Sequence, residues 1–302
     1  MKDFSGKLAV ITGGGTGIGR ALAKQLASEG CSVAMCDISE MDMEESCAHA
    51  LYGAPQGVRV TGFRADVAIE TELDAFCADT LEQHETDHIH LLFNNAGIAG
   101  GGSMINSPRE VWERTFGVCW YGVYYSARAF LPALTRADEG HMINVSSVNG
   151  FWASLGPETS HTAYSAAKFA VKGFTEALVN DFRNNAPHLK ASVVMPGHIG
   201  TNIALNTMRE FGELATSDLP SGDPQLADDP QARGEAFRDN GLDPQQAAQI
   251  ILQGVRDERW RILVGPDAEA LDQAVREAPE EAYEQEFMES RVAPILPTLM
   301  SQ

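Results

Sequence analysis

The stretch Thr12-Gly13-Gly14-Gly15-Thr16-Gly17-Ile18-Gly19-Arg20 decides the fold of this chain. It follows an apolar run at residues 8–11, which predicts a buried strand, and precedes Leu22 and Leu26, which have helical spacing. Glycine takes positive φ angles without steric cost and lets the backbone approach a pyrophosphate closely. A helix that begins near Gly17 would point free N–H groups at that anion. Strand, turn and helix together predict a dinucleotide site, with an ordinary βα turn as the alternative.

The composition is that of a globular protein. The chain has 302 residues, of which 44% are hydrophobic and 21% charged, so it can bury a substantial core. The formal net charge is −20, and such a surface repels nucleic acid and anionic lipid. Much of the acidic excess lies within residues 210–290, which we interpret as a solvated face. We therefore expect no nucleic-acid partner and no membrane partner.

The cysteines and the apolar runs indicate location. Five cysteines form an odd set without a C-x-x-C pair, so we expect neither a disulfide framework nor a metal site. A reduced, cytoplasmic protein is the default for such a chain. Residues 1–7 lack an apolar signal segment, and no run approaches the ~20 apolar residues that cross a bilayer.

Strand and helix patterns alternate along the chain. Polar residues end several of the apolar runs, at Asp37, Asp66 and Asn94-Asn95. Such alternation predicts an α/β fold, a Rossmann-type doubly wound parallel sheet of about seven strands in a single domain, with ligands beyond the carboxyl ends of the strands. Beyond residues 8–11, strands are expected at 31–37, 57–67, 89–93, 141–147, 191–195 and 260–265, and helices at 40–52, 69–85, 107–135 (ending near Pro132), 163–172 and 243–254.

Asp37 points to the kind of dinucleotide. It lies 18 residues after Gly19, where a carboxylate can accept hydrogen bonds from the adenosine ribose hydroxyls. The same carboxylate would repel a 2′-phosphate, and Ile38 provides no cation to attract one. The sequence therefore favours NAD over NADP. The alternative is a plain N-cap for the helix expected at residues 40–52, a position that suits both Asp37 and Ser39.

Residues 1–265 resemble the classical short-chain dehydrogenase/reductase family. The resemblance implies a single Rossmann-type domain, a nicotinamide cofactor, hydride transfer between an alcohol and a ketone, and a homo-oligomer, either tetramer or dimer. It rests on motifs in the family's order: Thr12-Gly13-x-x-x-Gly17-x-Gly19, Asp66-Val67, Asn94-Asn95-Ala96-Gly97, Ser147, Tyr164-x-x-x-Lys168, and Pro196-Gly197 with Thr201.

Ser147, Tyr164 and Lys168 are the candidate catalytic residues. A phenol is a poor base at its ordinary pKa of about 10, but Lys168 lies four residues on, and its ammonium favours the phenolate. Ser147 can donate a hydrogen bond to the substrate oxygen. The family also assigns Lys168 a hydrogen bond to the nicotinamide ribose. The alternative is an ordinary surface pair on a helix.

The resemblance also assigns cofactor contacts. Asp66 and Val67 would hold the adenine, Ile199 and Thr201 would contact the nicotinamide carboxamide and the phosphates, and residues 95–97 would line the adenosine ribose. We interpret His161 and His198 as solvated loop residues, with contact to the substrate as the alternative for each. The full expected cofactor set is Gly13, Thr16, Gly17, Ile18, Gly19, Asp37, Ile38, Asp66, Val67, Asn95, Ala96, Gly97, Tyr164, Lys168, Pro196, Gly197, Ile199 and Thr201.

The chain departs from the family at two places. Cys119 stands where many members carry an Asn, whose side chain shapes a helix kink beside a carbonyl that holds a proton-relay water. Because a thiol donates only weakly, we expect a weakened relay rather than an inactive enzyme. Ser147 and Tyr164 are 17 residues apart, more than is usual, and the excess within 151–161 is expected to edge the substrate pocket.

The remaining segments are expected to shape the pocket. Residues 202–242 are predicted to be a substrate loop or lid. Residues 266–302 form an acidic C-terminal extension, whose apolar end at 295–300 either packs on a neighbouring subunit or frays. Residues 98–104, 148–161 and 198–220 would border the pocket, with apolar side chains from Phe151, Trp152, Leu155, Ile203, Leu205 and Met208.

These expectations combine into one function. The chain is predicted to be an NAD-dependent oxidoreductase that acts on a secondary alcohol or ketone, a small molecule of apolar or cyclic character. One alternative is a cofactor-binding scaffold or regulator of the same fold that has lost catalysis, for which Cys119 is the only support. A lyase or epimerase on the same scaffold is a further alternative.

Overall fold

The fold is built on one parallel sheet. The computed structural model describes residues 1–154, 160–212 and 229–296. Within them the sheet has seven strands in the order β3-β2-β1-β4-β5-β6-β7, every neighbouring pair parallel, which confirms the predicted doubly wound fold. The strands are β1 (Leu8–Thr12), β2 (Ser32–Asp37), β3 (Val60–Arg64), β4 (Leu91–Asn94), β5 (Gly140–Val145), β6 (Leu189–Pro196) and β7 (Arg261–Val264).

The direction of the chain across the sheet reverses beside β1. From β1 the chain adds β2 and then β3 on one side, and it crosses to the other side with β4, β5, β6 and β7. The connections that leave β1 and β4 therefore run to opposite faces, which opens a crevice at their carboxyl ends. This is where the sequence analysis placed the candidate site.

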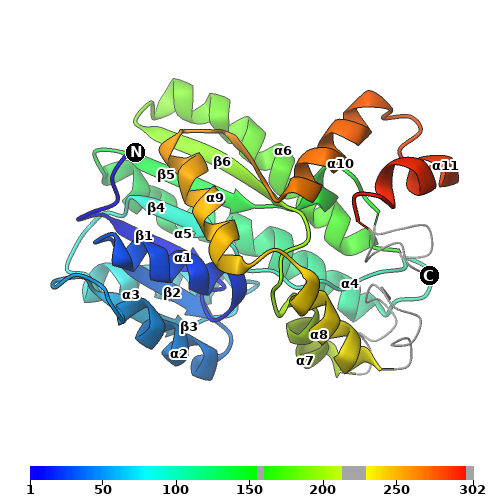
Figure 1. Cartoon of the computed structure of the whole chain (residues 1–302). Coiled ribbons are helices and arrows are strands. Elements are labelled where there is room, and N and C mark those ends of the chain that lie inside the picture. The colour runs from blue at the N-terminus through cyan, green and yellow to red at the C-terminus, as the bar shows by residue number, and fades with distance from the viewer. Residues whose placement is uncertain (155–159, 213–228, 297–302) are drawn as a thin grey trace.

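Helices cover both faces of the sheet (Figure 1). One face packs against α1, α2 and α9, and the other against α3, α5 and α6. The helices of these two layers are α1 (Gly17–Ser28), α2 (Glu40–Leu51), α3 (Glu70–Gln83), α5 (Gly122–Arg136), α6 (Thr162–Asn185) and α9 (Pro244–Arg256), and α4 (Arg109–Phe116) precedes a π turn, η1 (Gly117–Tyr121), that runs into α5.

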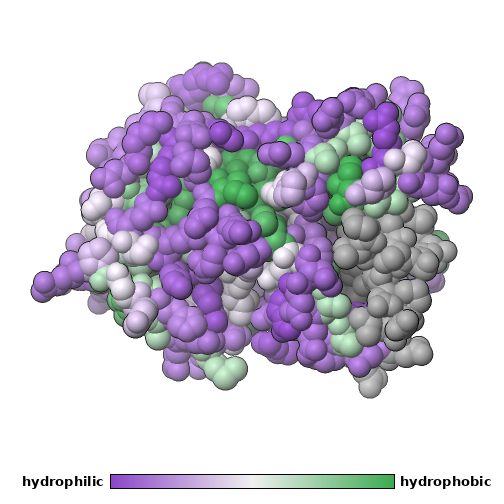
Figure 2. Space-filling view, viewed as in Figure 1, coloured by the Kyte–Doolittle hydropathy of each residue, from purple (hydrophilic) through white to green (hydrophobic). Residues whose placement is uncertain are grey.

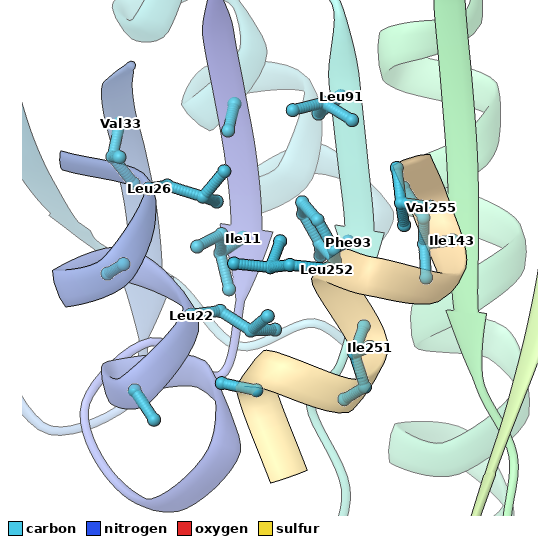
Figure 3. Close-up of a cluster of buried hydrophobic side chains, with 14 of the residues drawn as sticks. Ile11, Leu22, Leu26, Val33, Leu91, Phe93, Ile143, Ile251, Leu252 and Val255 are labelled. Carbon is cyan, nitrogen blue, oxygen red and sulfur yellow. The ribbon is translucent and has the colours of Figure 1, made fainter. Parts of the chain in front are cut away.

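The core follows from the alternation of side chains along each strand. In β1, Ile11 faces the α1 and α9 layer, whereas Val10 faces the layer of α3, α5 and α6. Figure 3 shows Leu22 of α1 and Leu252 of α9 approaching Ile11 between the two helices. All four side chains are fully buried, and each such burial stabilises the fold by about 1.5–3 kcal/mol.

One helix end differs from the expectation. Helix α5 was expected to end near Pro132, but it continues through Pro132 to Arg136. A proline inside a helix costs about 3 kcal/mol because it removes a backbone hydrogen bond. Here Phe130, Ala133 and Leu134 are all buried on either side of the proline, and this burial offsets the cost.

Residues 202–242 contain more regular structure than the sequence suggested. They form α7 (Ile203–Phe211) and α8 (Pro230–Asn240). The start of α8 does carry a local signal, since the Asp229 side chain accepts from the Ala232 N–H and Pro230 occupies the first turn. The part of the predicted lid at residues 213–228 lies outside the described residues.

The C-terminal extension packs closely against the segment that follows β5. It forms α10 (Pro266–Glu277), α11 (Gln285–Phe287) and a π turn, η5 (Met288–Val292). Its inner side joins Trp152 in one apolar cluster, while polar residues dominate the face in Figure 2. The Trp152 Nε1–H donates to the Ala282 carbonyl at 2.8 Å, and the Ala153 N–H donates to the Tyr283 hydroxyl at 3.1 Å. Of the predicted apolar end, Ile295 and Leu296 belong to this cluster and 297–300 lie outside the described residues.

All five cysteines are free. Over the described ranges, no helix is long and apolar enough to cross a membrane. The same ranges hold no group of three or more His, Cys, Asp or Glu side chains that could bind a metal ion.

Replacing Trp152 tests the attachment of the extension. Trp152→Phe keeps an aromatic ring in the cluster but leaves the buried Ala282 carbonyl without its donor, so we expect a loss of about 1–3 kcal/mol in the free energy of unfolding. Urea unfolding followed by circular dichroism measures this. The matched control is Trp260→Phe, because Trp260 is 46% exposed and should change stability little. An equal change in the free energy of unfolding for both variants would contradict the role of the Trp152 hydrogen bond.

Candidate active site

One cavity of about 450 Å³ lies at the carboxyl edge of the sheet. Every residue of the expected cofactor set lines it except Gly19, and Ser147 joins Tyr164 and Lys168 there. Cys119 is buried behind the lining. Residues far apart in the sequence thus meet in one space, as expected for the carboxyl ends of parallel strands.

The glycine turn is shaped for close backbone approach. Gly13 has φ +66°, and a Cβ there would stand 2.7 Å from the Ala96 Cα, so only glycine fits. Gly19 supports the turn from inside α1, where a Cβ would meet the Gly13 carbonyl oxygen at 2.1 Å. The first turn of α1 carries no acidic side chain, and Thr16 makes no capping bond to it. The first N–H groups of α1 are therefore available to an anion.

Hydrogen bonds tie the end of β1 to the end of β4. The Thr12 hydroxyl accepts from the backbone N–H groups of Asn95 and Ala96, at 3.0 and 3.2 Å. The Asn95 side-chain amide donates back to the Gly13 carbonyl at 3.0 Å. The two walls of the crevice are thereby held at a fixed distance.

Asp37 stands at the end of β2 beside the glycine turn. Its carboxylate accepts from the Gly15 N–H at 2.9 Å and from the Ser39 N–H at 3.2 Å. Burial raises the pKa of Asp37, and these hydrogen bonds oppose that rise. The alternative of a helix cap is wrong for Asp37, because Ser39 caps α2 by accepting from the Asp42 N–H. Asp42 also lines the cavity, and it pairs there with Arg209 at 3.4 Å.

Asp66 is held by an ion pair that reaches across the cavity. Arg114 of α4 contacts Asp66 at 2.8 Å and Glu210 of α7 at 2.7 Å. Helix α7 is also joined to the glycine turn, since the Asn206 amide donates to the Thr16 hydroxyl at 3.2 Å. These contacts hold α7 over the cavity.

Packing between the end of β5 and α6 brings the catalytic candidates together. The Ser146 hydroxyl donates to the Lys168 carbonyl at 2.8 Å, and a Cβ on Gly150 would stand 2.9 Å from the same oxygen. The Lys168 Nζ donates to the Val145 carbonyl at 3.0 Å and lies 5.3 Å from the centroid of the Tyr164 ring. The long spacing between Ser147 and Tyr164 therefore leaves strand and helix in contact.

Burial dominates the electrostatics of these groups. It raises the pKa of the Tyr164 phenol, and a hydrogen bond with Ser147 opposes this effect. It lowers the pKa of the Lys168 ammonium, because a charged form loses its hydration. Shifted titratable groups gathered in one cavity are typical of an active site.

Cys119 lies in the π turn η1. Its thiol donates to the Ile98 carbonyl at 3.2 Å, and the Gly122 N–H reaches back to the Gly117 carbonyl, the i→i+5 bond of a π turn. The irregular helix turn is thus present with a cysteine in place of the asparagine that many family members carry.

Comparisons with known proteins decide the family. The family described as short chain dehydrogenase matches residues 7–210. A protein of Mycobacterium tuberculosis named SadH, provisionally described as an oxidoreductase, is 37% identical over 281 residues, which are 91% of this chain and 92% of that protein. The chain belongs to the short-chain dehydrogenase/reductase family.

Two solved structures of short-chain dehydrogenases resemble this one. A Burkholderia phymatum enzyme in complex with NAD has a TM-score of 0.79 at 32% identity, covering 93% of this chain and 96% of that chain. A metagenomic oxidoreductase in complex with NADP has a TM-score of 0.57 at 28% identity, covering 64% and 83%. Both nicotinamide dinucleotides thus occur among relatives.

The wall of the cavity differs from the one predicted for this short-chain dehydrogenase. Ile203 lines it, and Leu155 lies outside the described residues. The expectation was wrong for four side chains, because Phe151 and Trp152 pack against the C-terminal extension and Leu205 and Met208 pack against Gly234 of α8. The apolar wall consists instead of Val148, Phe237, Leu271 and Leu296. Leu271 sits on an apolar stripe with Ala268, Ala274 and Val275, a helical pattern that could have been found in the sequence.

The two histidines are also placed differently. His198 is half-buried, with Nε2 2.7 Å from the Phe237 carbonyl. His161 is 6% exposed, stacks on Tyr164, and has no hydrogen-bond partner for either ring nitrogen within the described part of the chain. The interpretation as a solvated residue was wrong for His161, where an unpartnered buried nitrogen costs about 1–3 kcal/mol.

A pair of glycine variants tests the packing of the glycine turn. Gly19→Ala would drive a methyl group into the Gly13 carbonyl, so we expect destabilisation of about 2 kcal/mol or more. The control is Gly173→Ala in α6, where a Cβ meets nothing within 4 Å and should stabilise the helix by about 0.5–1 kcal/mol. Thermal unfolding of the two variants should shift in opposite directions. If Gly19→Ala unfolded at the wild-type temperature, the turn would accommodate a Cβ at this position and the packing described here would be contradicted.

Proposed function

We propose that this chain is an NAD-dependent dehydrogenase or reductase that transfers hydride between a secondary alcohol or ketone and a nicotinamide. One observation carries the proposal. Ser147, Tyr164 and Lys168 line the same cavity as the glycine turn and Asp37. A base, a hydrogen-bond donor and a dinucleotide cradle therefore share one space of about 450 Å³.

The residues present fit a nicotinamide dinucleotide. The positive φ of Gly13 and Gly17 and the free N–H groups of α1 suit a pyrophosphate. Asp37 would accept from the adenosine ribose, Asp66 and Val67 would border the adenine, and Lys168 would donate to the second ribose. When bound, the nicotinamide ring supplies or accepts the hydride.

The protein's part in the reaction is to move one proton and to hold one oxygen. In oxidation, Tyr164 Oη takes the proton of the substrate hydroxyl while the carbinol carbon loses hydride. Ser147 Oγ donates to the same oxygen and keeps it in place. The Lys168 ammonium, 5.3 Å from the phenol ring, favours the phenolate. In reduction the proton returns from Tyr164 to the oxygen.

Cys119 bears on the supply of that proton. Its thiol is committed to the Ile98 carbonyl, and the π turn that surrounds it is intact. We propose that the relay to Lys168 runs through backbone groups of this turn, weakened by the lack of an amide side chain but not abolished. An intact turn around Cys119 favours an active enzyme over a scaffold that has lost catalysis.

The character of the cavity suggests the substrate. Val148, which follows Ser147, packs with Leu271 and Leu296, and these three line the cavity together with Phe237. An apolar or alicyclic alcohol or ketone would fit such a wall. Helices α7 and α8, the described parts of the predicted loop at 202–242, would cover it, within a single domain.

The proposal extends to the oligomeric state, the location and the partners of the protein. Exposed aromatic side chains on η1, α5 and α6, at Tyr121, Tyr124 and Phe169, support a homo-oligomer, either tetramer or dimer. Five free cysteines support a cytoplasmic location. The net charge of −20 supports the absence of a nucleic-acid partner.

The pH dependence tests the role of Tyr164. Because burial raises its pKa, the phenolate is a minor form at neutral pH, and its fraction grows about tenfold for each pH unit below that pKa. We expect kcat/KM for alcohol oxidation to rise with pH between about 6 and 9, whereas ketone reduction, which uses the protonated phenol, should not rise. NADH absorbance measures both directions.

Tyr164→Phe belongs to the same test. It should lower kcat/KM about 100-fold or more and abolish the rise with pH. The control is Tyr52→Phe, because Tyr52 is 86% exposed and far from this chemistry. Retention of both rate and pH profile in Tyr164→Phe would rule out the assignment.

Asp37 tests the choice of cofactor. The wild type should bind NAD⁺ at least about tenfold more tightly than NADP⁺, since Asp37 opposes a 2′-phosphate. Asp37→Ala should relax that preference, as measured by calorimetric titration of both nucleotides. The control is Asp74→Ala, an exposed carboxylate on α3. An unchanged preference in Asp37→Ala would contradict the role of this carboxylate.

A further inference from the structure

The imidazole of His161 is a polar group of the cavity that the reaction above does not use. His161 stands at the N-cap of α6, three residues before Tyr164. The two rings stack in parallel, with centroids 4.6 Å apart and planes 7° apart. His161 is 94% buried, and within the described residues Nδ1 and Nε2 both lack a hydrogen-bond partner. A buried polar group of this kind usually meets a water or a ligand.

Three other polar side chains that line the cavity form hydrogen bonds within the protein. His198 Nε2 pairs with the Phe237 carbonyl at 2.7 Å. The Asn149 amide donates to the carbonyls of Trp152 and Ser154 at 3.1 and 2.9 Å. The Asp267 carboxylate accepts from the backbone N–H of His198 at 2.6 Å. His161 differs from them in having both of its polar atoms available.

The charge state of His161 restricts the kind of ligand. Burial lowers its pKa to about 4, so at neutral pH the ring is uncharged, with one nitrogen that donates and one that accepts. Such a ring can accept from a hydroxyl or donate to a carbonyl. The Asp267 carboxylate lines the same cavity and disfavours an anionic substrate.

We propose that His161 binds a second, uncharged oxygen of the substrate, a hydroxyl or carbonyl group close to the reacting carbinol carbon. The stacking on Tyr164 sets the ring beside the place where that carbon reacts. Val148, Leu271 and Leu296 would take the hydrocarbon frame. The substrate class is therefore a diol or hydroxyketone on an apolar, ring-like frame. This inference rests on the proposed function and names its substrate more closely.

A pair of alcohols tests the inference. Cyclohexanol and trans-cyclohexane-1,2-diol share one frame and differ by the second oxygen, and their kcat/KM values with NAD⁺ give a ratio. We expect the wild type to favour the diol. His161→Phe keeps a ring that can stack but removes both nitrogens, so the ratio should fall about tenfold, the worth of one hydrogen bond.

Two further variants separate recognition from structure. His161→Gln keeps a donor and an acceptor, and it should recover part of the ratio. His49→Phe changes an exposed histidine on α2 and should leave the ratio at its wild-type value. An equal loss on both alcohols in His161→Phe, or an unchanged ratio, overturns the inference, as does a wild type without preference for the diol.

Failure of the proposed function would look different. It would appear as a wild type that oxidises neither alcohol with NAD⁺ or NADP⁺. The inference is then tested by calorimetric titration of the diol into the protein loaded with NADH. Weaker binding by His161→Phe than by the wild type supports it, whereas equal affinity, or no binding by either protein, overturns it.

Discussion

The parallel pairing of β1 with β2 on one side and β4 on the other is the constraint on which the site depends. Because the chain reverses direction across the sheet at this point, the segments that leave β1 and β4 diverge and open a crevice. The Thr12 hydroxyl, which accepts from both Asn95 and Ala96, fixes the distance between its walls. Gly13 then brings its backbone so close to Ala96 that no side chain fits.

A second contact gives the crevice its chemistry. The end of β5 packs on the backbone of α6 through Ser146 and Gly150, so Ser147 and Tyr164 meet although 17 residues separate them. The same packing buries Lys168, which is why its pKa falls while that of Tyr164 rises. Trp152, early in the intervening segment, donates to the C-terminal extension, and His161, near its end, stacks on Tyr164.

The sequence predicted what short-range patterns determine. The alternation of apolar runs and helical spacing predicted the succession of strands and helices along the chain. The glycine turn indicated the place of the cavity, because positive φ and close backbone approach require glycine. Asp37 and Asp66 fell at strand ends, as their position after apolar runs indicated. Pro132 misled, because its local cost is offset by the burial of Phe130 and Leu134, which a single helix does not show.

Long-range packing was beyond the sequence. The contribution of Leu271 and Leu296 to the cavity depends on where the C-terminal extension folds back. The apolar stripe of α10 does not specify that position. The burial of His161 depends on its stacking with Tyr164.

Deuterium transfer tests the central claim most directly. The purified protein is given NAD⁺ and a secondary alcohol deuterated at the carbinol carbon, and the NADH formed is examined by proton NMR. The account predicts that the deuterium appears at C4 of the nicotinamide ring, and that Tyr164→Phe slows its appearance. NADH without deuterium, or an altered substrate with no transfer to the nicotinamide, would show that the cavity performs a different reaction.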